Sequence, residues 1–259
     1  MGSQGSGDGA VRSGHWLGAA LLGAADLLMP PLCPACRTAV GAHDRLCPAC
    51  WSRLRFIERP FCPVLGVPFS ADLGEAIVSA EALADPPPFR RARSAVLFDE
   101  TARLLVHQLK YRDQPGAAGI VAALTLRAAR ELADRADLVV PVPLHRFRLW
   151  QRRFNQSAEI SARLAAGLGL EHAPMALMRT RRTRQQVGLN ARERAANMRG
   201  AFCVRERFRP LVAGRQVLLV DDVYTSGATI KAATKALLRA RAESVDVVTF
   251  ARAGIDPLG

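Results

Sequence analysis

A short segment near the C-terminal end of the chain combines two adjacent carboxylates with a turn of small residues. The apolar run 217–220 is followed by Asp221 and Asp222, and then by a turn that leads into a segment with helical periodicity. The turn consists of Thr225, Ser226, Gly227, Ala228 and Thr229. Its backbone N–H groups and hydroxyls, together with the N-terminus of a following helix, can bind one phosphate group, and glycine lets the backbone approach closely. The pattern predicts a phosphate site in the turn.

The carboxylates of Asp221 and Asp222 would repel a phosphate, so they need a different contact. They can accept hydrogen bonds from the hydroxyls of a sugar, or approach a Mg²⁺ ion that is already bound to the sugar phosphate. A phosphate at the turn and a diol at the carboxylates together describe a ribose 5-phosphate. The alternative is an ordinary strand, turn and helix with a capping Thr and incidental acids. The pattern occupies thirteen contiguous positions, 217–229, which favours the ligand site.

Four cysteines near the N-terminal end form two matched pairs, Cys33 with Cys36 and Cys47 with Cys50. Each pair has two intervening residues, and ten residues separate the pairs, the spacing of two metal-binding knuckles that share one tetrahedral ion. The alternative is a disulfide or unrelated core cysteines, but disulfides are disfavoured in the reducing compartment expected for this chain. We predict a structural Zn²⁺ ion, because protein ligands fill all four positions and leave none for water or substrate.

The two other cysteines are expected to have no metal. Cys62 is followed three positions later by Leu65, where a further knuckle would need a cysteine, so we expect no second ion there. Cys203 lies in the apolar run 201–204 and is predicted to pack in the core.

Strand-like and helical segments alternate after Phe89. The expected strands are residues 94–98, 137–142, 216–220 and 244–250, and the expected helices are residues 100–110, 116–133, 154–168 and 229–240. Apolar strands that alternate with amphipathic helices predict an α/β fold, a parallel sheet covered by helices on both faces. Ligands of such sheets bind beyond the carboxyl ends of the strands, which is where Asp221 and Asp222 stand.

The remaining segments define the expected domain organisation. Residues 1–14 are rich in Gly and Ser and are predicted to be a disordered leader. Residues 15–68 are expected to hold a short helix and the zinc knuckle, residues 69–88 a linker that ends in three prolines, and residues 89–259 the α/β domain. The apolar run 16–29 could be mistaken for a signal peptide, but Asp26 interrupts it, so we expect a cytoplasmic protein.

Composition indicates a folded protein with a preference for anionic partners. Of the 259 residues, 49% are apolar and 23% are charged, which excludes a disordered chain, and no run of eighteen uncharged apolar residues predicts a membrane span. The formal charge is +13, from 36 basic and 23 acidic residues. Only three of the basic residues are lysines, so part of this excess reflects a general bias toward arginine. Phosphorylated metabolites and nucleic acids are the partner classes that such a charge favours.

Residues 217–229 closely resemble the signature loop of type I phosphoribosyltransferases, which bind phosphoribosyl pyrophosphate. Further segments resemble one family, the ComF-type competence proteins, also called the ComF/GntX family. These segments are residues 109–111, 141–145, 152–156 and 182–186, with Arg194 and Asn197. That family joins an N-terminal zinc knuckle to a phosphoribosyltransferase domain, in the order found here. The resemblance covers residues 16–252 and departs from the family pattern at Leu65, Arg153 and Ser226.

The resemblance implies which residues contact the pyrophosphate. It places Pro143, Leu144 and His145 in the loop after the first core strand, with Arg152 nearby, and it puts Arg184 in a flap over the substrate. Arginine suits this role because its planar guanidinium binds phosphate oxygens through several hydrogen bonds. For each single arginine a solvated surface position is the alternative, and His145 is as readily a structural residue as a ligand.

Two functions are compatible with these features. The first is transfer of a phosphoribosyl group from phosphoribosyl pyrophosphate and Mg²⁺ to a nitrogen acceptor, with Asp221, Asp222 and Arg152 at the reacting group. Purine-salvage enzymes of this fold commonly carry an aspartate where Thr225 stands, which argues against a 6-oxopurine acceptor. The second is a non-catalytic accessory protein for DNA uptake that binds single-stranded DNA or helicase and recombination proteins. Its sequence offers few aromatic residues for base stacking.

Overall fold

The computed structural model describes residues 30–72, 77–109, 115–143, 155–180, 198 and 200–254. The leader expected at residues 1–14 and the helix expected at residues 16–29 lie outside the described residues. Within the described part of the chain, every helix is too short or too polar to cross a bilayer.

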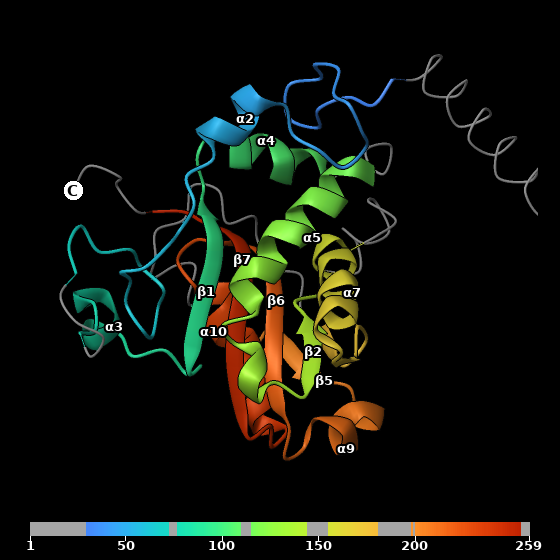
Figure 1. Ribbon diagram of the computed structural model, residues 1–259. Coiled ribbons are helices and arrows are strands. Elements are labelled where there is room, and N and C mark those ends of the chain that lie inside the picture. The colour runs from blue at the N-terminus through green and yellow to red at the C-terminus, as the bar shows by residue number, and fades with distance from the viewer. Residues whose placement is uncertain are drawn as a thin grey trace, which may run out of the picture.

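A five-stranded sheet with the order β1-β7-β6-β2-β3 forms the centre of the molecule (Figure 1). Its strands are β1 (Arg91–Leu97), β2 (Leu138–Pro141), β3 (Glu171–His172), β6 (Gln216–Tyr224) and β7 (Ser244–Arg252). All four neighbouring pairs are parallel. The predicted parallel α/β fold is therefore confirmed.

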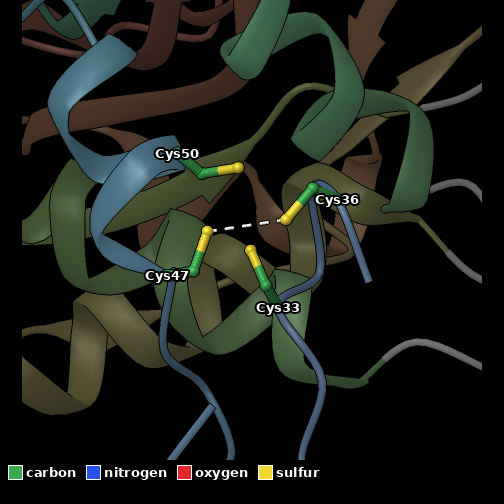
Figure 2. A group of neighbouring side chains, drawn as sticks. All are labelled: Cys33, Cys36, Cys47 and Cys50. Atoms are coloured by element: carbon green, nitrogen blue, oxygen red, sulfur yellow. Dashed lines mark hydrogen bonds between the residues drawn. The ribbon is translucent and has the colours of Figure 1, made fainter. Parts of the chain in front are cut away.

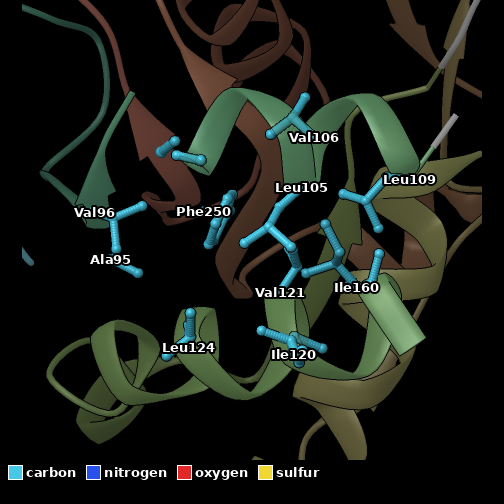
Figure 3. Close-up of a cluster of buried hydrophobic side chains, with 14 of the residues drawn as sticks. Ala95, Val96, Leu105, Val106, Leu109, Ile120, Val121, Leu124, Ile160 and Phe250 are labelled. Carbon is cyan, nitrogen blue, oxygen red and sulfur yellow. The ribbon is translucent and has the colours of Figure 1, made fainter. Parts of the chain in front are cut away.

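Alternate residues of the central strands face two separate cores. Leu218 and Val220 of β6 pack with α4 (Glu100–Gln108), α5 (Pro115–Ala129) and α7 (Gln156–Leu168) on one face of the sheet. Figure 3 shows this cluster, in which Leu105, Val121 and Ile160 from the three helices meet Phe250 of β7. Val217 and Leu219 of β6 face the other core. That core holds α10 (Ala228–Arg239) and the two-stranded antiparallel sheet of β4 (Leu177–Arg179) and β5 (Phe202–Val204).

Several element boundaries and the burial of one cysteine differ from the sequence predictions. Strand β1, expected at residues 94–98, begins at Arg91, and β7, expected to end at residue 250, continues to Arg252. Strand β6 was expected to end at Val220 but continues to Tyr224, because Val223 and Tyr224 pair with β7. The helix expected at residues 116–133 ends at Ala129 and is followed by the 3₁₀ turn η1 (Ala133–Arg135). The prediction that Cys203 packs in the core is wrong: its neighbours in β5 are buried, whereas the alternation of a strand leaves Cys203 partly exposed.

The chain before β1 covers the outer edge of the sheet. Residues 31–54, which include α2 (Pro48–Arg53), contribute buried side chains to the core that α4 and α5 share. Phe56 then forms an antiparallel bridge with Val96 of the edge strand. Residues 60–85, which include α3 (Ala80–Ala84), lie beside β1 and α3 packs into the second core. The region expected to be a linker thus contains a helix, and these contacts protect the edge of the sheet from pairing with other chains. Figure 1 shows α2 and α3 at opposite ends of β1.

A candidate phosphoribosyl site and a candidate zinc site

The carboxylate pair lies where the carboxyl ends of two central strands meet. Pro141 of β2 is in register with Val220 of β6, and the backbone N–H of Val142 donates to the carbonyl of Val220 at 2.8 Å. Pro143 therefore leaves the sheet beside Asp221 and Asp222. This edge is where parallel sheets bind ligands.

The two carboxylates have different environments. Asp221 is only 9% exposed, and its Oδ1 accepts from the hydroxyl of Ser157 and from the backbone N–H of Asp222, both at 3.0 Å. Burial raises the pKa of Asp221 well above its ordinary value, and the charge of Asp222 acts in the same direction, while the bond from Ser157 opposes it. Asp222 is only partly buried and accepts from the N–H of Val223 at 2.8 Å. The two carboxylates are thus adjacent in sequence but differ in burial and in hydrogen-bond partners.

The small-residue turn has the geometry of an anion site at a helix N-terminus. Gly227 adopts a left-handed φ of 70° and is the N-cap of α10, a helix of 12 residues. A Cβ atom at Gly227 would lie closer than 3.0 Å to the hydroxyl of Tyr224, so the turn rests directly on that side chain. Only glycine combines this φ with this close packing.

Buried polar atoms surround the site without hydrogen-bond partners among the described residues. They are Asn155 Oδ1, Gln156 Nε2 and Ser226 Oγ. Asn155 donates from Nδ2 to the carbonyl of Val142 at 3.2 Å, which places it against the loop after β2. Unsatisfied buried polar atoms are costly, and a cluster of them beside a carboxylate pair is typical of a site that a polar ligand completes. The carboxylate oxygens of Asp221 and Asp222 are also of the type that suits Mg²⁺ bound to a phosphate.

A buried arginine supports the turn from the far side of Tyr224. The guanidinium of Arg252 lies 4.3 Å from the centre of the Tyr224 ring, and Arg252 is only 3% exposed. It donates to the carbonyl of Leu65 at 2.9 Å and to the carboxylate of Glu81 at 3.2 Å. Through Arg252, the N-terminal segment contacts the side chain on which the turn rests.

The structure describes only part of the site that the sequence predicts. It brings together Asp221, Asp222, Pro143 and the turn of residues 225–229. Leu144, His145, Arg152 and Arg184 lie outside the described residues. Ser157, Tyr224 and Arg252 were missed in the sequence, because nothing in their spacing links them to the carboxylates or to the turn.

The four cysteines of the predicted zinc knuckle converge on one point (Figure 2). The sulfur atoms of Cys33, Cys36, Cys47 and Cys50 all lie within 4.8 Å of one another. The Sγ atoms of Cys36 and Cys47 are 3.5 Å apart. This donor set fits a tetrahedral Zn²⁺ ion, since four thiolates are a common structural zinc site.

The electrostatics of the cluster suit a cation. The side chain and the backbone of Thr38 lower the pKa of Cys36 to about 6, which favours the thiolate that a metal requires. Burial raises the pKa of Cys50, and the neighbouring sulfur atoms add to that shift. A bound cation would offset the repulsion between these sulfur atoms, so that Cys50 could lose its proton and become a ligand.

We expect that Cys36→Ser lowers the zinc content from about one equivalent per chain to nearly none. The segment of residues 31–54, called the first ribbon below, loses the metal that supplies much of its folding free energy, while the central sheet stays folded. Elemental analysis of freshly purified protein measures the loss. Cys203→Ser is the matched control, because Cys203 lies outside the cluster. A Cys36→Ser protein that retains a full equivalent would contradict the assignment.

Comparisons with known proteins match both parts of the chain. A profile of the double zinc ribbon domain matches residues 24–82, and a profile of the phosphoribosyl transferase domain matches residues 155–258. The DNA utilization protein YhgH of Escherichia coli O157:H7 is 33% identical over 232 residues, which is 87% of this chain and 99% of that protein.

Two competence proteins are also similar. Competence protein F of Haemophilus influenzae is 32% identical over 161 residues, which is 60% of this chain and 69% of that protein. Competence protein ComFC of Bacillus subtilis is 26% identical over 216 residues, which is 81% of this chain and 85% of that protein. The order of a zinc ribbon followed by a phosphoribosyltransferase domain agrees with the sequence prediction.

Proposed function

Because the chain belongs to the ComF family of competence and DNA utilization proteins, we propose that its phosphoribosyltransferase domain binds phosphoribosyl pyrophosphate together with Mg²⁺ and transfers the phosphoribosyl group to a nitrogen acceptor. One observation carries the proposal. The glycine turn at the N-terminus of α10 follows directly on a carboxylate pair, and three buried polar atoms beside them have no partner among the described residues. A ribose 5-phosphate would satisfy both groups at once.

Each element of the site has a proposed task. The N–H groups of the turn bind the 5-phosphate, where the helix N-terminus favours negative charge. Asp222, the more exposed of the two carboxylates, accepts from the ribose hydroxyls, and Asp221, whose burial raises its pKa, lies directly beside it. The loop that begins at Pro143, with Arg152 and Arg184, is proposed to bind the pyrophosphate. When bound to the pyrophosphate, Mg²⁺ would neutralise charge on the leaving group.

The acceptor is proposed to be a nitrogen nucleophile other than a 6-oxopurine. Thr225 is exposed at the start of the turn, and its hydroxyl is not a base at neutral pH. The protein would then contribute positioning and charge stabilisation at the ribose C1 rather than proton abstraction at this position.

Calorimetry on the full chain tests the proposal. Titration with phosphoribosyl pyrophosphate and Mg²⁺ should give a saturable heat, and ribose 5-phosphate should compete with it because both occupy the turn. A panel of nitrogen acceptors is then screened for release of pyrophosphate. If neither sugar phosphate gives a heat, the proposal is wrong; if binding occurs but no acceptor reacts, the domain is a ligand sensor.

The second candidate is a non-catalytic accessory protein of DNA uptake, acting in the cytoplasm on single-stranded DNA or with helicase and recombination proteins. One surface favours it. Trp51 is 50% exposed on the first ribbon and lies 5.3 Å from the ring of Phe56, over which Arg127 is placed at 5.5 Å. Aromatic rings beside arginines are the surface on which unpaired bases stack. Single-strand binding that weakens steeply with salt and is reduced in Trp51→Ala would support this function.

A further inference from the structure

Residues 60–69 repeat the backbone of residues 31–40, twenty-nine positions later. In the first segment, the N–H of Arg37 donates to the carbonyl of Cys33 and the N–H of Cys33 donates to the carbonyl of Thr38, both at 2.8 Å. In the second segment, Gly66, Cys62 and Val67 make the same two bonds, also at 2.8 Å. The left-handed residue recurs as well, with φ 66° at Arg37 and 65° at Gly66. Both segments are therefore zinc-knuckle turns.

The second half of the ribbon repeats in the same way. Cys47 is the N-cap of α2 and Ser79 is the N-cap of α3. The N–H of Cys50 donates to the carbonyl of Cys47 at 3.1 Å, and the N–H of Ala82 donates to the carbonyl of Ser79 at 3.0 Å. These bonds align each cysteine of the first ribbon with one residue of the second. The second set is Cys62, Leu65, Ser79 and Ala82, equivalent to Cys33, Cys36, Cys47 and Cys50.

The two halves of the second ribbon meet as those of the first ribbon do. The Sγ of Cys62 accepts from the N–H of Leu65 at 3.4 Å and from the N–H of Ser79 at 3.3 Å. The helix N-terminus is therefore brought to the knuckle even without a set of thiolates. Leu65 and Ala82 are buried in the second core. The Oγ of Ser79 is buried without a hydrogen-bond partner in the described part of the chain.

The chemistry of these four positions does not fit a metal ion. Leu65 and Ala82 have no donor atom, and one thiol with one hydroxyl is too few ligands for a structural zinc site. The match to a double zinc ribbon implies two ions, and the second set of residues disagrees with it. We infer that the second ribbon folds without metal, with an apolar core in place of the ion, and that the protein holds a single zinc ion in the first ribbon.

Protein contacts replace what the ion would supply. The carbonyl of Leu65, in the knuckle itself, accepts from Arg252 at 2.9 Å, and Glu81 of α3 pairs with the same guanidinium. The carbonyl of Val64 accepts from the N–H of Ala92 in β1 at 2.7 Å. The knuckle and the helix of the second ribbon are thus both fixed to the sheet. These contacts hold the two halves of the second ribbon together, as the shared ion holds the two halves of the first ribbon.

Restoring the ligands tests the inference. The triple variant Leu65→Cys/Ser79→Cys/Ala82→Cys should raise the metal content from about one to about two ions per chain, because the backbone already presents the four positions at knuckle spacing. Metal content is measured by elemental analysis, and Co²⁺ substitution reports tetrahedral thiolate ligation by its absorption. A wild-type protein with two ions would overturn the inference, as would a folded triple variant with only one.

A second pair of variants keeps the inference testable if the triple variant fails to fold. Cys62→Ala should leave the zinc content unchanged, whereas Cys33→Ala, its equivalent in the first ribbon, should remove the ion. Both thiols are fully buried, so the two variants delete the same group from equally buried positions. A loss of zinc in Cys62→Ala with zinc retained in Cys33→Ala would show that the ion lies in the second ribbon, contrary to the inference.

Discussion

An Asp221→Asn/Asp222→Asn variant is expected to lose the affinity for phosphoribosyl pyrophosphate and to unfold at the wild-type temperature or slightly above it. Each charge-assisted hydrogen bond lost contributes about 1.5–3 kcal/mol, so two of them lower the affinity by about 10²–10⁴-fold. Stability does not fall, because the free protein no longer holds the buried carboxylate of Asp221 next to that of Asp222, and Asn at position 221 can still accept from Ser157. Calorimetry and thermal unfolding measure the two effects.

Asp246→Asn is the matched control with the opposite expectation. Asp246 is also buried, at 3% exposure, but it is paired with Arg90 at 2.5 Å and with Arg91 at 2.8 Å. Removing the charge from such a pair costs about 3 kcal/mol of stability, and the site should keep its ligand. If the double variant behaved like Asp246→Asn, with a large loss of stability and retained binding, the carboxylate pair would be structural.

The pH dependence of stability should also distinguish the wild type from the Asp221→Asn/Asp222→Asn variant. The pKa of Asp221 in the folded state is raised above its ordinary value of 3.8, so the folded protein keeps a proton that the unfolded chain has released. The free energy of unfolding of the wild type therefore loses a contribution as the pH rises above about 4, toward the raised pKa. The double variant lacks this loss, and its advantage in stability should grow over the same range. Thermal unfolding at a series of pH values measures the difference.

Much of the fold follows from the periodicity of the sequence. The four long helices and the central strands were predicted because their apolar residues repeat with the spacing of buried helices and strands. The end of β6 was not predicted, because two acidic residues interrupt the apolar pattern there. The strand continues to Tyr224 since β7 supplies backbone partners and Tyr224 fills the second core. Tertiary packing therefore decides where the carboxylates stand.

The ribbon fold of the second ribbon was not predicted from the sequence, because a zinc ribbon is recognised by its metal-binding cysteines and most of these are replaced here. With Leu65 and Ala82 in place of cysteines, the segment has neither a metal signature nor a long helical pattern. One signal was available: Gly66 stands after Cys62 at the same offset as Arg37 after Cys33. The contacts of Ser157 with Asp221 and of Arg252 with Tyr224 join distant segments, and a single sequence carries no local trace of such pairs.

Gly227→Ala is expected to lower the affinity for phosphoribosyl pyrophosphate about tenfold or more and to destabilise the fold. A left-handed alanine costs about 1–2 kcal/mol. The new Cβ also meets the hydroxyl of Tyr224, which is held in place by Arg252 on one side and by Phe89 at 6.4 Å on another. Because Tyr224 cannot move freely, the turn itself must shift, and its N–H groups leave the positions that bind the phosphate.

Gly214→Ala separates the strain of the backbone from the collision with Tyr224. Gly214 has a φ of 72°, nearly the same as the 70° of Gly227, but a Cβ at Gly214 meets nothing within 4 Å. Gly214→Ala should lose only the stability that a left-handed alanine costs, and it should bind phosphoribosyl pyrophosphate with wild-type affinity. Equal losses of stability in the two variants, with binding unchanged in both, would mean that the turn does not rest on Tyr224 and does not hold the phosphate. A loss of affinity confined to Gly227→Ala would support the turn as the phosphate site, since the two substitutions impose the same backbone strain.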